Sequence, residues 1–344
     1  MPRLLRITSQ PVEQFGRGKL ASRLILWPFP SIDWAMQSPV SRRNFLKKSL
    51  QAGAAVSGLG LLGNRAKAIE PFKRSGSPRF QLSLAAYSFR DFFKSKDADG
   101  KLDLFQFIDF CAQHGCEGAE LTSYYFPKDA GPDYFTQIRR HAFLRGVNVS
   151  GTAVGNNFAL PKGDKLAAQI RDVKRWIDNA ALFGAPHIRV FAGPVPKDIS
   201  ETDARKNCIE ALEECCEHAG GHGIFLGLEN HGGIVAQADG LLEIVRAVKS
   251  PWLGVNLDTG NFHTKDPYGD LARCAPYAVN VQFKVAVRES GQAKQDADFP
   301  RLFEMLREAN YQGYVVLEYE AKEDPWTAVP ALLKEMKQLI LARS

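Results

Sequence analysis

Short apolar runs that resemble β-strands alternate along this chain with longer amphipathic runs that resemble α-helices. Apolar and polar residues alternate in many of the short runs, as in a strand with one buried face. The strand-like runs lie at 81–89, 118–126, 148–156, 187–194, 224–232, 252–260, 278–285 and 314–320. The pattern therefore predicts eight strands separated by helical segments.

Between these strands, apolar residues recur every three to four positions, as on the buried face of a helix. Clear examples are residues 104–115, 165–184 and 208–220, and each of them ends at a glycine. Glycine is common just beyond helix ends because it adopts the left-handed backbone conformation without strain. The segments between the strands are therefore predicted to be helices.

Eight strand–helix units in about 260 residues match a (β/α)₈ TIM barrel, which is an α/β fold. A doubly wound sheet is the alternative, but it would carry a glycine-rich phosphate turn after an early strand, and no such motif is present. No linker-like stretch divides the region. We expect residues 69–80 to form a linker and residues 81–344 to form one barrel domain.

Charge is spread unevenly over the 344 residues, whose formal net charge is +6. Residues 1–80 hold 14 Lys and Arg against 3 Asp and Glu, which leaves 30 against 35 for residues 81–344. The basic character therefore belongs to the N-terminal segment, and the expected barrel is acidic. A nucleic-acid partner is not expected.

The N-terminal segment, residues 1–68, resembles a twin-arginine export signal. Arg42 and Arg43 precede a weakly apolar stretch at 51–63, and the sequence Ala-Lys-Ala at 66–68 fits a cleavage site. The apolar stretch is too short and glycine-rich for a stable membrane anchor. We expect the twin-arginine machinery to be a partner and the mature protein to be periplasmic or otherwise exported. A disordered basic N-terminus is the alternative.

Met36 is an alternative start of this signal region, because residues 1–35 form a long, mixed extension before the arginine pair. N-terminal sequencing of the precursor tests this hypothesis, and finding residues 1–35 there would refute it.

None of the six cysteines has the C-x-x-C spacing of a metal site. Three of them, Cys208, Cys215 and Cys216, fall within one predicted helix. We interpret the cysteines as small buried residues rather than disulfide partners, although an exported protein would tolerate disulfides.

Polar residues gather at the C-terminal ends of the last four predicted strands. Because strand side chains alternate between two faces, one inward residue fixes the facing of its neighbours two positions away. The shared inward face then carries Glu229 and His231; Asn256 and Asp258; Asn280, Gln282 and Lys284; and Glu318 and Glu320. Active sites of TIM barrels lie at this end of the strands.

Three carboxylates that meet in a narrow barrel mouth repel one another and are costly to bury unless a cation compensates them. Glu229, Asp258 and Glu318, together with the amide oxygen of Gln282, offer an all-oxygen site. Such a site favours a hard divalent cation, Mn²⁺ or Mg²⁺, over Zn²⁺. A buried hydrogen-bond network without a metal is the alternative.

Four motifs in this region resemble the xylose isomerase-like TIM-barrel family, also called sugar phosphate isomerases/epimerases. They are LENHGG (228–233), NLDTGNF (256–262), NVQFK (280–284) and VLEYE (316–320), and the resemblance spans residues 81–341. It implies one divalent metal held by Glu229, Asp258, Gln282 and Glu318.

The resemblance also implies a reaction. In the ketose epimerases of the family, the two metal-bound glutamates exchange a proton at carbon, and the metal stabilises an enediolate next to the bound carbonyl. Glu229 and Glu318 would then be the catalytic pair.

Several further residues are candidates for binding the substrate: Glu120, Arg189, His231, Asn261, His263 and Lys284. Four of them have a structural alternative: Lys284 as a counter-ion to the carboxylates, Arg189 as a helix cap, Glu120 as a partner of a neighbouring strand's backbone, and His231 as a structural residue at a strand end.

This sequence departs from the family pattern at two places. The histidine often found three residues after the aspartate is Asn261 here, and His263 comes two residues later. The ligand on the seventh strand is Gln282, as in the hydroxypyruvate isomerase-like branch, where ketose 3-epimerases have histidine.

The sequence thus predicts a metal-dependent isomerase or epimerase of a small sugar or keto-sugar. A 3-keto-glycoside lyase with the same site and a non-catalytic sugar-binding protein are the alternatives. The oligomeric state is undecided, and a homo-oligomer stays open.

Overall fold

The computed structural model describes residues 69–95 and 101–342. The predicted signal region, residues 1–68, lies outside the described residues, so the twin-arginine prediction and the Met36 alternative stay predictions.

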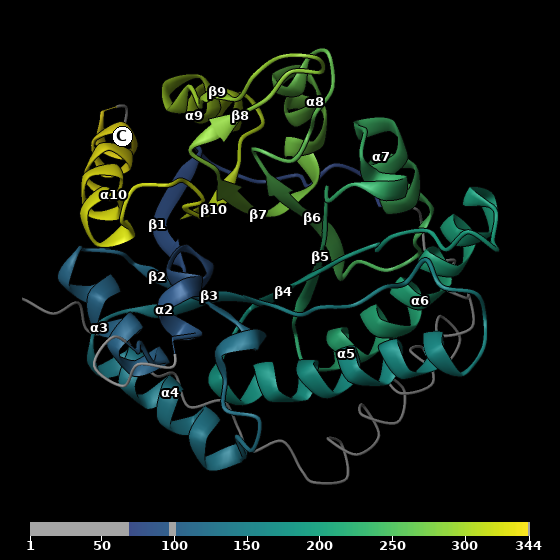
Figure 1. Cartoon of the computed structure of the whole chain (residues 1–344), viewed down its shortest axis with the longest axis horizontal. Helices are drawn as coiled ribbons and strands as arrows, with labels where there is room; N and C mark the ends of the chain where they lie inside the picture. The colour runs from purple at the N-terminus through teal and green to yellow at the C-terminus, as the bar shows by residue number, and fades with distance from the viewer. Residues whose placement is uncertain (1–68, 96–100, 343–344) are drawn as a thin grey trace, which may run out of the picture. The chain divides into compact units, whose positions relative to one another are not determined.

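Eight parallel strands form a closed barrel, as predicted (Figure 1). Around the barrel the order is β1-β10-β7-β6-β5-β4-β3-β2, so each strand pairs with its neighbour in the chain and β10 pairs with β1. The barrel strands are β1 (Arg79–Ala85), β2 (Gly118–Thr122), β3 (Asn148–Ala153), β4 (His187–Val190), β5 (Phe225–Glu229), β6 (Leu253–Asp258), β7 (Ala278–Phe283) and β10 (Gln312–Leu317). A short antiparallel pair, β8 (Ala286–Val287) and β9 (Gln295–Asp296), follows β7.

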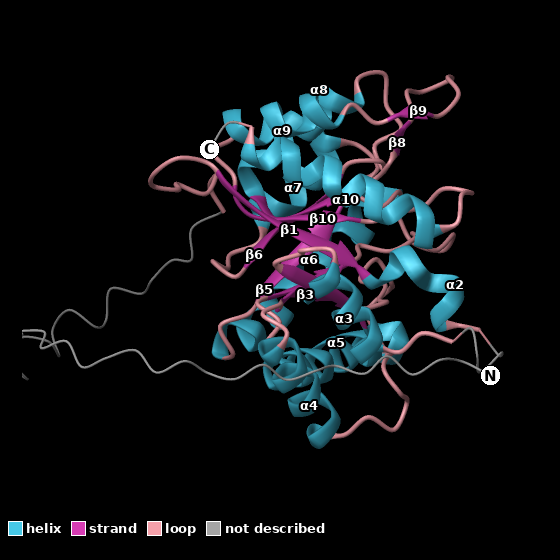
Figure 2. Cartoon of the chain, turned by 90° about the vertical axis from the view of Figure 1, so that its left-hand side faces the viewer, coloured by secondary structure: helices cyan, strands magenta, loops and turns pink. Residues whose placement is uncertain are grey.

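Helices surround the strands on the outside of the barrel (Figure 2). They are α2 (Arg90–Phe93), α3 (Leu104–Gln113), α4 (Pro132–Leu144), α5 (Asp164–Phe183), α6 (Glu201–Gly221), α7 (Ala238–Ala247), α8 (Pro267–Cys274), α9 (Phe299–Glu308) and α10 (Pro325–Leu341). Four 3₁₀ turns lie between them: η1 (Ala86–Phe89), η2 (Ser123–Tyr125), η3 (Gly233–Val235) and η4 (Ala275–Tyr277). This arrangement confirms the (β/α)₈ barrel as one domain.

The strands end earlier than the sequence pattern predicts. The run expected to continue to residue 232 leaves the sheet after Glu229, and the last barrel strand ends at Leu317 rather than at residue 320. In the first case the N–H of His231 donates to the C=O of Glu229 at 2.9 Å, so the chain turns directly after Glu229. Glu229 and Glu318 therefore lie at the rim of the barrel.

Helix α6 begins earlier than predicted, at Glu201 rather than residue 208. The Ser200 hydroxyl accepts a hydrogen bond from the backbone N–H of Asp203 and so caps the helix. At the end of α5, Gly184 has the left-handed conformation that the sequence predicted (φ 81°).

The segment predicted as a linker lies against the barrel. The N–H of Phe72 donates to the carbonyl of Pro276, and the Asn310 amide donates to the carbonyl of Arg74. Strand β1 then begins at Arg79, two residues before the expected start of the domain. Residues 72–78 therefore form part of the folded unit.

Apolar side chains fill the space between the strands and the helices, whereas several strands turn polar side chains into the barrel. Val255 and Leu257 are fully buried toward the helices, as the alternation predicts. All six cysteines lie among the described residues, and they are buried and free, which confirms their interpretation as small buried side chains. Among the described helices, none is both long and apolar enough to cross a membrane.

Candidate active site

The mouth of the barrel holds an unusual number of buried charges. The charged side chains that are buried at the mouth or, for Glu120, directly below it come from six strands or strand ends: Glu120, Arg189, Glu229, Asp258, Lys284 and Glu318. We call these six residues the mouth cluster. It contains the three carboxylates that the sequence predicted to meet.

Lys284 lies among these carboxylates. Its Nζ donates to Glu318 Oε1 at 2.9 Å and to Glu320 Oε2 at 2.9 Å, and lies 3.4 Å from Asp258 Oδ2. The ammonium thus acts as a counter-ion to the carboxylates, one of the two roles considered for this residue. Its placement follows from β7, because Lys284 is two residues beyond Gln282 and shares its facing.

Asp258 has one carboxylate oxygen without a hydrogen bond. Its Oδ1 accepts from the N–H of Gly260 at 2.8 Å, whereas Oδ2 is buried without a hydrogen bond and lies 3.4 Å from the Lys284 ammonium. The backbone of Asp258 is held by Asn230, whose side-chain amide accepts from its N–H and donates to its C=O, both at 2.9 Å. Asp258 is therefore rigidly placed and retains an oxygen that can accept a further ligand.

Glu229 is held at both carboxylate oxygens. Arg189 Nε lies 2.9 Å from Oε2, and Asn261 Nδ2 donates to Oε1 at 2.9 Å. The Arg189 guanidinium also donates to the carbonyl of Val154 and stacks on the Phe191 ring at 3.8 Å. Arg189 thus faces the barrel interior and orients Glu229, rather than capping a helix.

Below the mouth, Gln282 belongs to a buried amide network. Its Nε2 donates to Glu120 Oε1 at 2.6 Å, and its Oε1 accepts from Asn256 at 2.7 Å. Asn280 donates to Glu120 Oε2 and to Asn256 Oδ1. Glu120 therefore fixes the orientation of the Gln282 amide, and its place in this network makes it a positioning residue for the predicted ligand.

A histidine closes this network from below. His187 Nε2 lies 3.4 Å from Asn256 Oδ1, and the ring fits there because residue 151 is glycine. A Cβ at Gly151 would lie 2.1 Å from the imidazole. Burial lowers the pKa of His187 to about 4, so the ring is neutral.

The charges of the mouth cluster do not balance. Within the cluster, four carboxylates face two basic groups, which leaves an excess of two negative charges if all are ionised. The neighbouring Glu320, which shares the Lys284 ammonium, adds to this excess. Burial, opposed by the nearby cations, raises the pKa of Glu229 and of Asp258 to about 7. Burial and the charge of Glu318 raise the pKa of Glu120 to about 7 as well. These shifts express above all the cost of burying the carboxylates, to which their mutual repulsion adds.

A divalent cation fits this arrangement in charge and in donor chemistry. It would supply the two missing positive charges, and Asp258 Oδ2 is a buried acceptor without a hydrogen bond. The side chains are not drawn together as ligands, however. Among the described residues, the group of His, Cys, Asp and Glu whose ligand atoms all lie within 4.8 Å is elsewhere, at Asp178, His218 and His222. Lys284 occupies the space between Asp258 and Glu318.

The remaining candidates lie at the rim. His231 is exposed and its ring lies 4.6 Å from the Phe191 ring, while His263 Nδ1 lies 2.8 Å from Arg288. A cavity of about 700 Å³ beside the mouth is lined by Asn261 and His263 but by none of the four predicted ligands. Asn261 therefore connects Glu229 to this cavity. The substrate contacts themselves stay predictions.

Sequence reasoning missed the supporting residues. Asn230 holds the backbone of Asp258, and Asn256 holds the side-chain amide of Gln282. Glu320 accepts a hydrogen bond from the Lys284 ammonium. The alternation of the strands placed Asn256 and Glu320 on the inward face but gave no sign of their partners. The sequence feature that pointed to Asn230 as a supporting residue was its position directly after Glu229.

Comparisons with known proteins agree with this architecture. A human protein provisionally named as a hydroxypyruvate isomerase is 24% identical to this chain over 244 residues. The aligned region covers 61% of this chain and 82% of the human protein. The structure of L-ribulose 3-epimerase superposes with a TM-score of 0.61 at 16% identity, covering 76% of this chain and 93% of that one. The structure of 3-keto-D-glucoside 4-epimerase from E. coli gives a TM-score of 0.58 at 15% identity, covering 76% and 100%.

At these identities the two structures establish the fold alone. The model of one protein family, described as the xylose isomerase-like TIM barrel, matches residues 108–338. This match includes all four motifs at the strand ends. The chain therefore belongs to the xylose isomerase-like TIM barrel family.

Proposed function

We propose that this protein is a divalent-metal-dependent sugar isomerase or epimerase in which glutamates move a proton next to a carbonyl. The observation that carries the proposal is the mouth cluster near the C-terminal ends of the strands. Its four buried carboxylates face only two basic side chains, Arg189 and Lys284. Isomerase and epimerase names among relatives and structural neighbours support the same reaction class.

The residues that would hold the cation are Glu229, Asp258, Gln282 and Glu318. When bound, a cation such as Mn²⁺ or Mg²⁺ would polarise the carbonyl of the substrate and make the adjacent C–H more acidic. The all-oxygen donor set and the unbonded Asp258 Oδ2 support a hard cation.

Glu229 is suited to be a proton acceptor. Burial raises its pKa to about 7, which matches a group that takes up and returns a proton near neutral pH. Arg189 and Asn261 fix both oxygens of the carboxylate, so its direction is set before a substrate arrives.

Glu318 follows β10, which is separated from β5 by β6 and β7 in the barrel. The second carboxylate thus approaches from another side of the mouth, and the Lys284 ammonium holds it in place. Two carboxylates on different strands can remove a proton from one face of a carbon and deliver one to the other, as epimerisation requires.

A 3-keto-glycoside lyase is the second candidate. The same proton removal next to the ketone would expel the neighbouring glycosidic oxygen as the C–O bond breaks. The cavity of about 700 Å³ beside Asn261 favours a substrate with a group beyond a single sugar ring. The likeness to 3-keto-D-glucoside 4-epimerase also supports a keto-sugar substrate class.

One experiment separates these candidates. The purified protein, loaded with Mn²⁺ after its native metal content has been measured, is incubated in D₂O with a panel of keto sugars and 3-keto-glycosides. Deuterium at carbon with a changed configuration supports the isomerase or epimerase, and release of the aglycone supports the lyase. Sugar binding without any exchange would favour a non-catalytic binding protein and contradict the proposal, as would a protein that takes up no divalent metal.

We further propose that the protein is exported through the twin-arginine machinery, on the basis of residues 41–68. Export of folded protein suits a metal site that is filled before the chain meets competing cations outside. Fractionation of cells that express wild-type protein and an Arg42→Lys/Arg43→Lys variant tests this, since the variant is expected to stay in the cytoplasm. An equal distribution of the two would contradict export by this route.

A further inference from the structure

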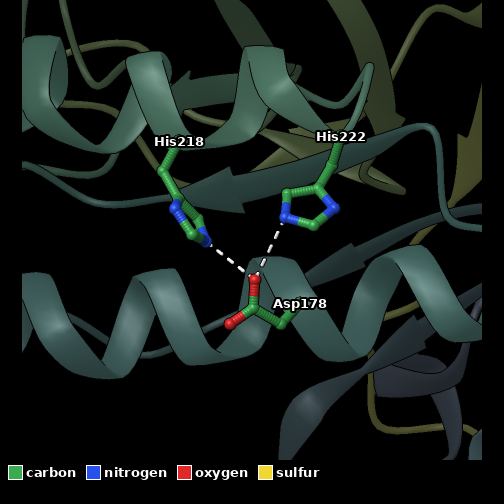
Figure 3. Close-up of side chains that lie close together, drawn as sticks. All are labelled: Asp178, His218 and His222. Carbon is green, nitrogen blue, oxygen red and sulfur yellow. Dashed lines mark hydrogen bonds and ion pairs between the residues drawn. The ribbon is translucent and has the colours of Figure 1, made fainter.

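Two histidines and one aspartate meet between helices α5 and α6, on the outside of the barrel. His218 Nε2 lies 2.7 Å from Asp178 Oδ1, and His222 Nε2 lies 3.1 Å from the same oxygen. Figure 3 shows both imidazoles directed from one helix toward the carboxylate on the other. We call these three residues the helix cluster.

The positions on the helices explain this convergence. His218 lies in the last turn of α6 and His222 is the C-cap residue four positions later, still with helical backbone angles, so their side chains project from the same face. Asp178 lies on α5, 40 residues before His218 in the sequence. One turn earlier, Lys174 and Glu214 form a parallel contact at 2.8 Å that keeps the two helices in register.

The three ligand atoms lie close to the spacing that a bound ion requires. They all lie within 4.8 Å of one another. Zn²⁺ binds imidazole nitrogen and carboxylate oxygen at about 2.0–2.2 Å, so two ligand atoms on one ion stand at most about 4 Å apart. Small side-chain rotations would bring the three atoms around one ion.

Hydrogen bonding without a metal is the competing explanation. The contrast with Asp109 is informative, because that carboxylate accepts from one imidazole, His141, and from the guanidinium of Arg145. Arginine can only donate, so the Asp109 group is complete as an ion-pair cluster. In the helix cluster, a second imidazole takes the place of the arginine and offers a second nitrogen that can bind a metal.

The helix cluster is separate from the mouth. Helix α6 ends where β5 begins, so its last turn lies at the N-terminal end of the barrel strands, opposite the end that carries the mouth cluster. The side chains of His218 and His222 are about one third exposed, and that of Asp178 is about half exposed. An ion can therefore reach these residues from solvent.

We propose that Asp178, His218 and His222 form a surface site for a divalent cation of borderline softness, such as Zn²⁺, which links α5 to α6. Two imidazoles and one carboxylate are a ligand set that zinc commonly uses, and water can fill the open fourth position. The ion would bind the folded protein and stabilise the contact between the two helices.

Calorimetric titration of the metal-free, full-length protein with Zn²⁺ tests this site. The His218→Gln/His222→Gln variant is expected to lose one equivalent of bound Zn²⁺ per chain relative to wild type. The His141→Gln variant, which removes a histidine paired with a single aspartate, is the matched control and is expected to retain it. The Asp258→Asn variant shows how much Zn²⁺ binds at the mouth. This variant is expected to lose any such ion and to keep the equivalent of Zn²⁺ bound at the helix cluster.

Two further measurements guard against a misfolded variant. Circular dichroism and the metal-free unfolding midpoint show whether the double variant folds, and Asp178→Asn keeps a polar group of the same size while removing the charge. Asp178→Asn is expected to weaken Zn²⁺ binding at this site at least tenfold. Equal stoichiometry and affinity in the wild type and the folded double variant would overturn the proposal.

Discussion

The mouth cluster and the helix cluster both gather side chains of types that can bind metal ions from distant parts of the chain, but they do so in opposite surroundings. The mouth cluster is buried, built of carboxylates and partly neutralised by Lys284 and Arg189. The helix cluster is open to solvent and pairs two imidazoles with one carboxylate.

Under the two proposals, burial and donor type together set which cation each cluster would take. Buried carboxylates repel one another, so the mouth needs added positive charge and offers oxygen to hard cations. Exposed imidazoles carry no such penalty, and nitrogen favours softer metals. Changes at one cluster should therefore leave the other unaffected.

The largest expected effect comes from the proposed catalytic pair. Glu229→Gln or Glu318→Gln should lower the rate of deuterium exchange into substrate by about 10²–10⁴-fold, because an amide cannot accept the proton. Exchange followed by NMR measures this, and Glu335→Gln on the exposed face of α10 is the control. Zn²⁺ titration of the same variants should still detect binding at the helix cluster. If a variant lost both deuterium exchange and this Zn²⁺ binding, the two clusters would not be independent.

Lys284→Met should destabilise the metal-free protein by about 3–5 kcal/mol, the usual cost of leaving buried charges without their partner. The ammonium contacts Glu318 and lies near Asp258, and the side chain is only 10% exposed. Urea unfolding in the presence of a chelator measures the effect, with the exposed Lys334→Met as control. An unchanged free energy of unfolding would mean that the carboxylates are protonated in the folded protein and need no counter-ion.

The mouth also predicts a pH dependence of stability in metal-free protein. Burial raises the pKa of Asp258 from its ordinary 3.8 to about 7, so between these values the folded protein holds a proton that the unfolded chain releases. Stability is therefore highest below about pH 4 for this group and declines as pH rises through 7, by on the order of a few kcal/mol. Comparing urea unfolding of wild type and Asp258→Asn at pH 5 and pH 8 isolates the effect, because the variant should lose this part of the slope. A steeper slope in the variant would contradict it.

The smallest effect is expected from the support below the mouth. Glu120→Gln places an amide opposite the Gln282 and Asn280 amides and breaks at least one hydrogen bond, so Mn²⁺ affinity should fall about 10–100-fold. Calorimetric titration with Mn²⁺ measures this. Ser83→Ala, which removes a hydrogen bond to Ser150 inside the barrel, serves as the control. If Mn²⁺ binds Glu120→Gln as tightly as wild type, Gln282 is not a ligand that Glu120 positions.

The barrel was predictable from the sequence because each strand carries its own alternation. Once Asp258 faces inward, Asn256 must do so too, and the buried contacts between Asn256, Asn280 and Gln282 confirm that facing. Strand ends were less predictable, since the expected strand included the polar residues up to 232, whereas β5 leaves the sheet after Glu229.

Contacts across the barrel were beyond the sequence pattern. Glu120 meets Asn280 from 160 residues away, a contact that depends on how the barrel closes. The direction of the Lys284 ammonium depends on its rotamer and on three carboxylates from other segments. The helix cluster likewise requires α5 and α6 to pack in one register, although the spacing of His218 and His222 was visible in the sequence.

The tethered ammonium of Lys284 has a consequence for the order of events during maturation. Small metal-dependent domains often stay unfolded until their ion arrives, because nothing else offsets the repulsion or replaces the missing contacts. A chain that brings its own positive group to the acidic rim can finish its barrel first. Under the proposed function, chain folding and ion uptake would be separate steps in time, and uptake would require the Lys284 side chain to move aside.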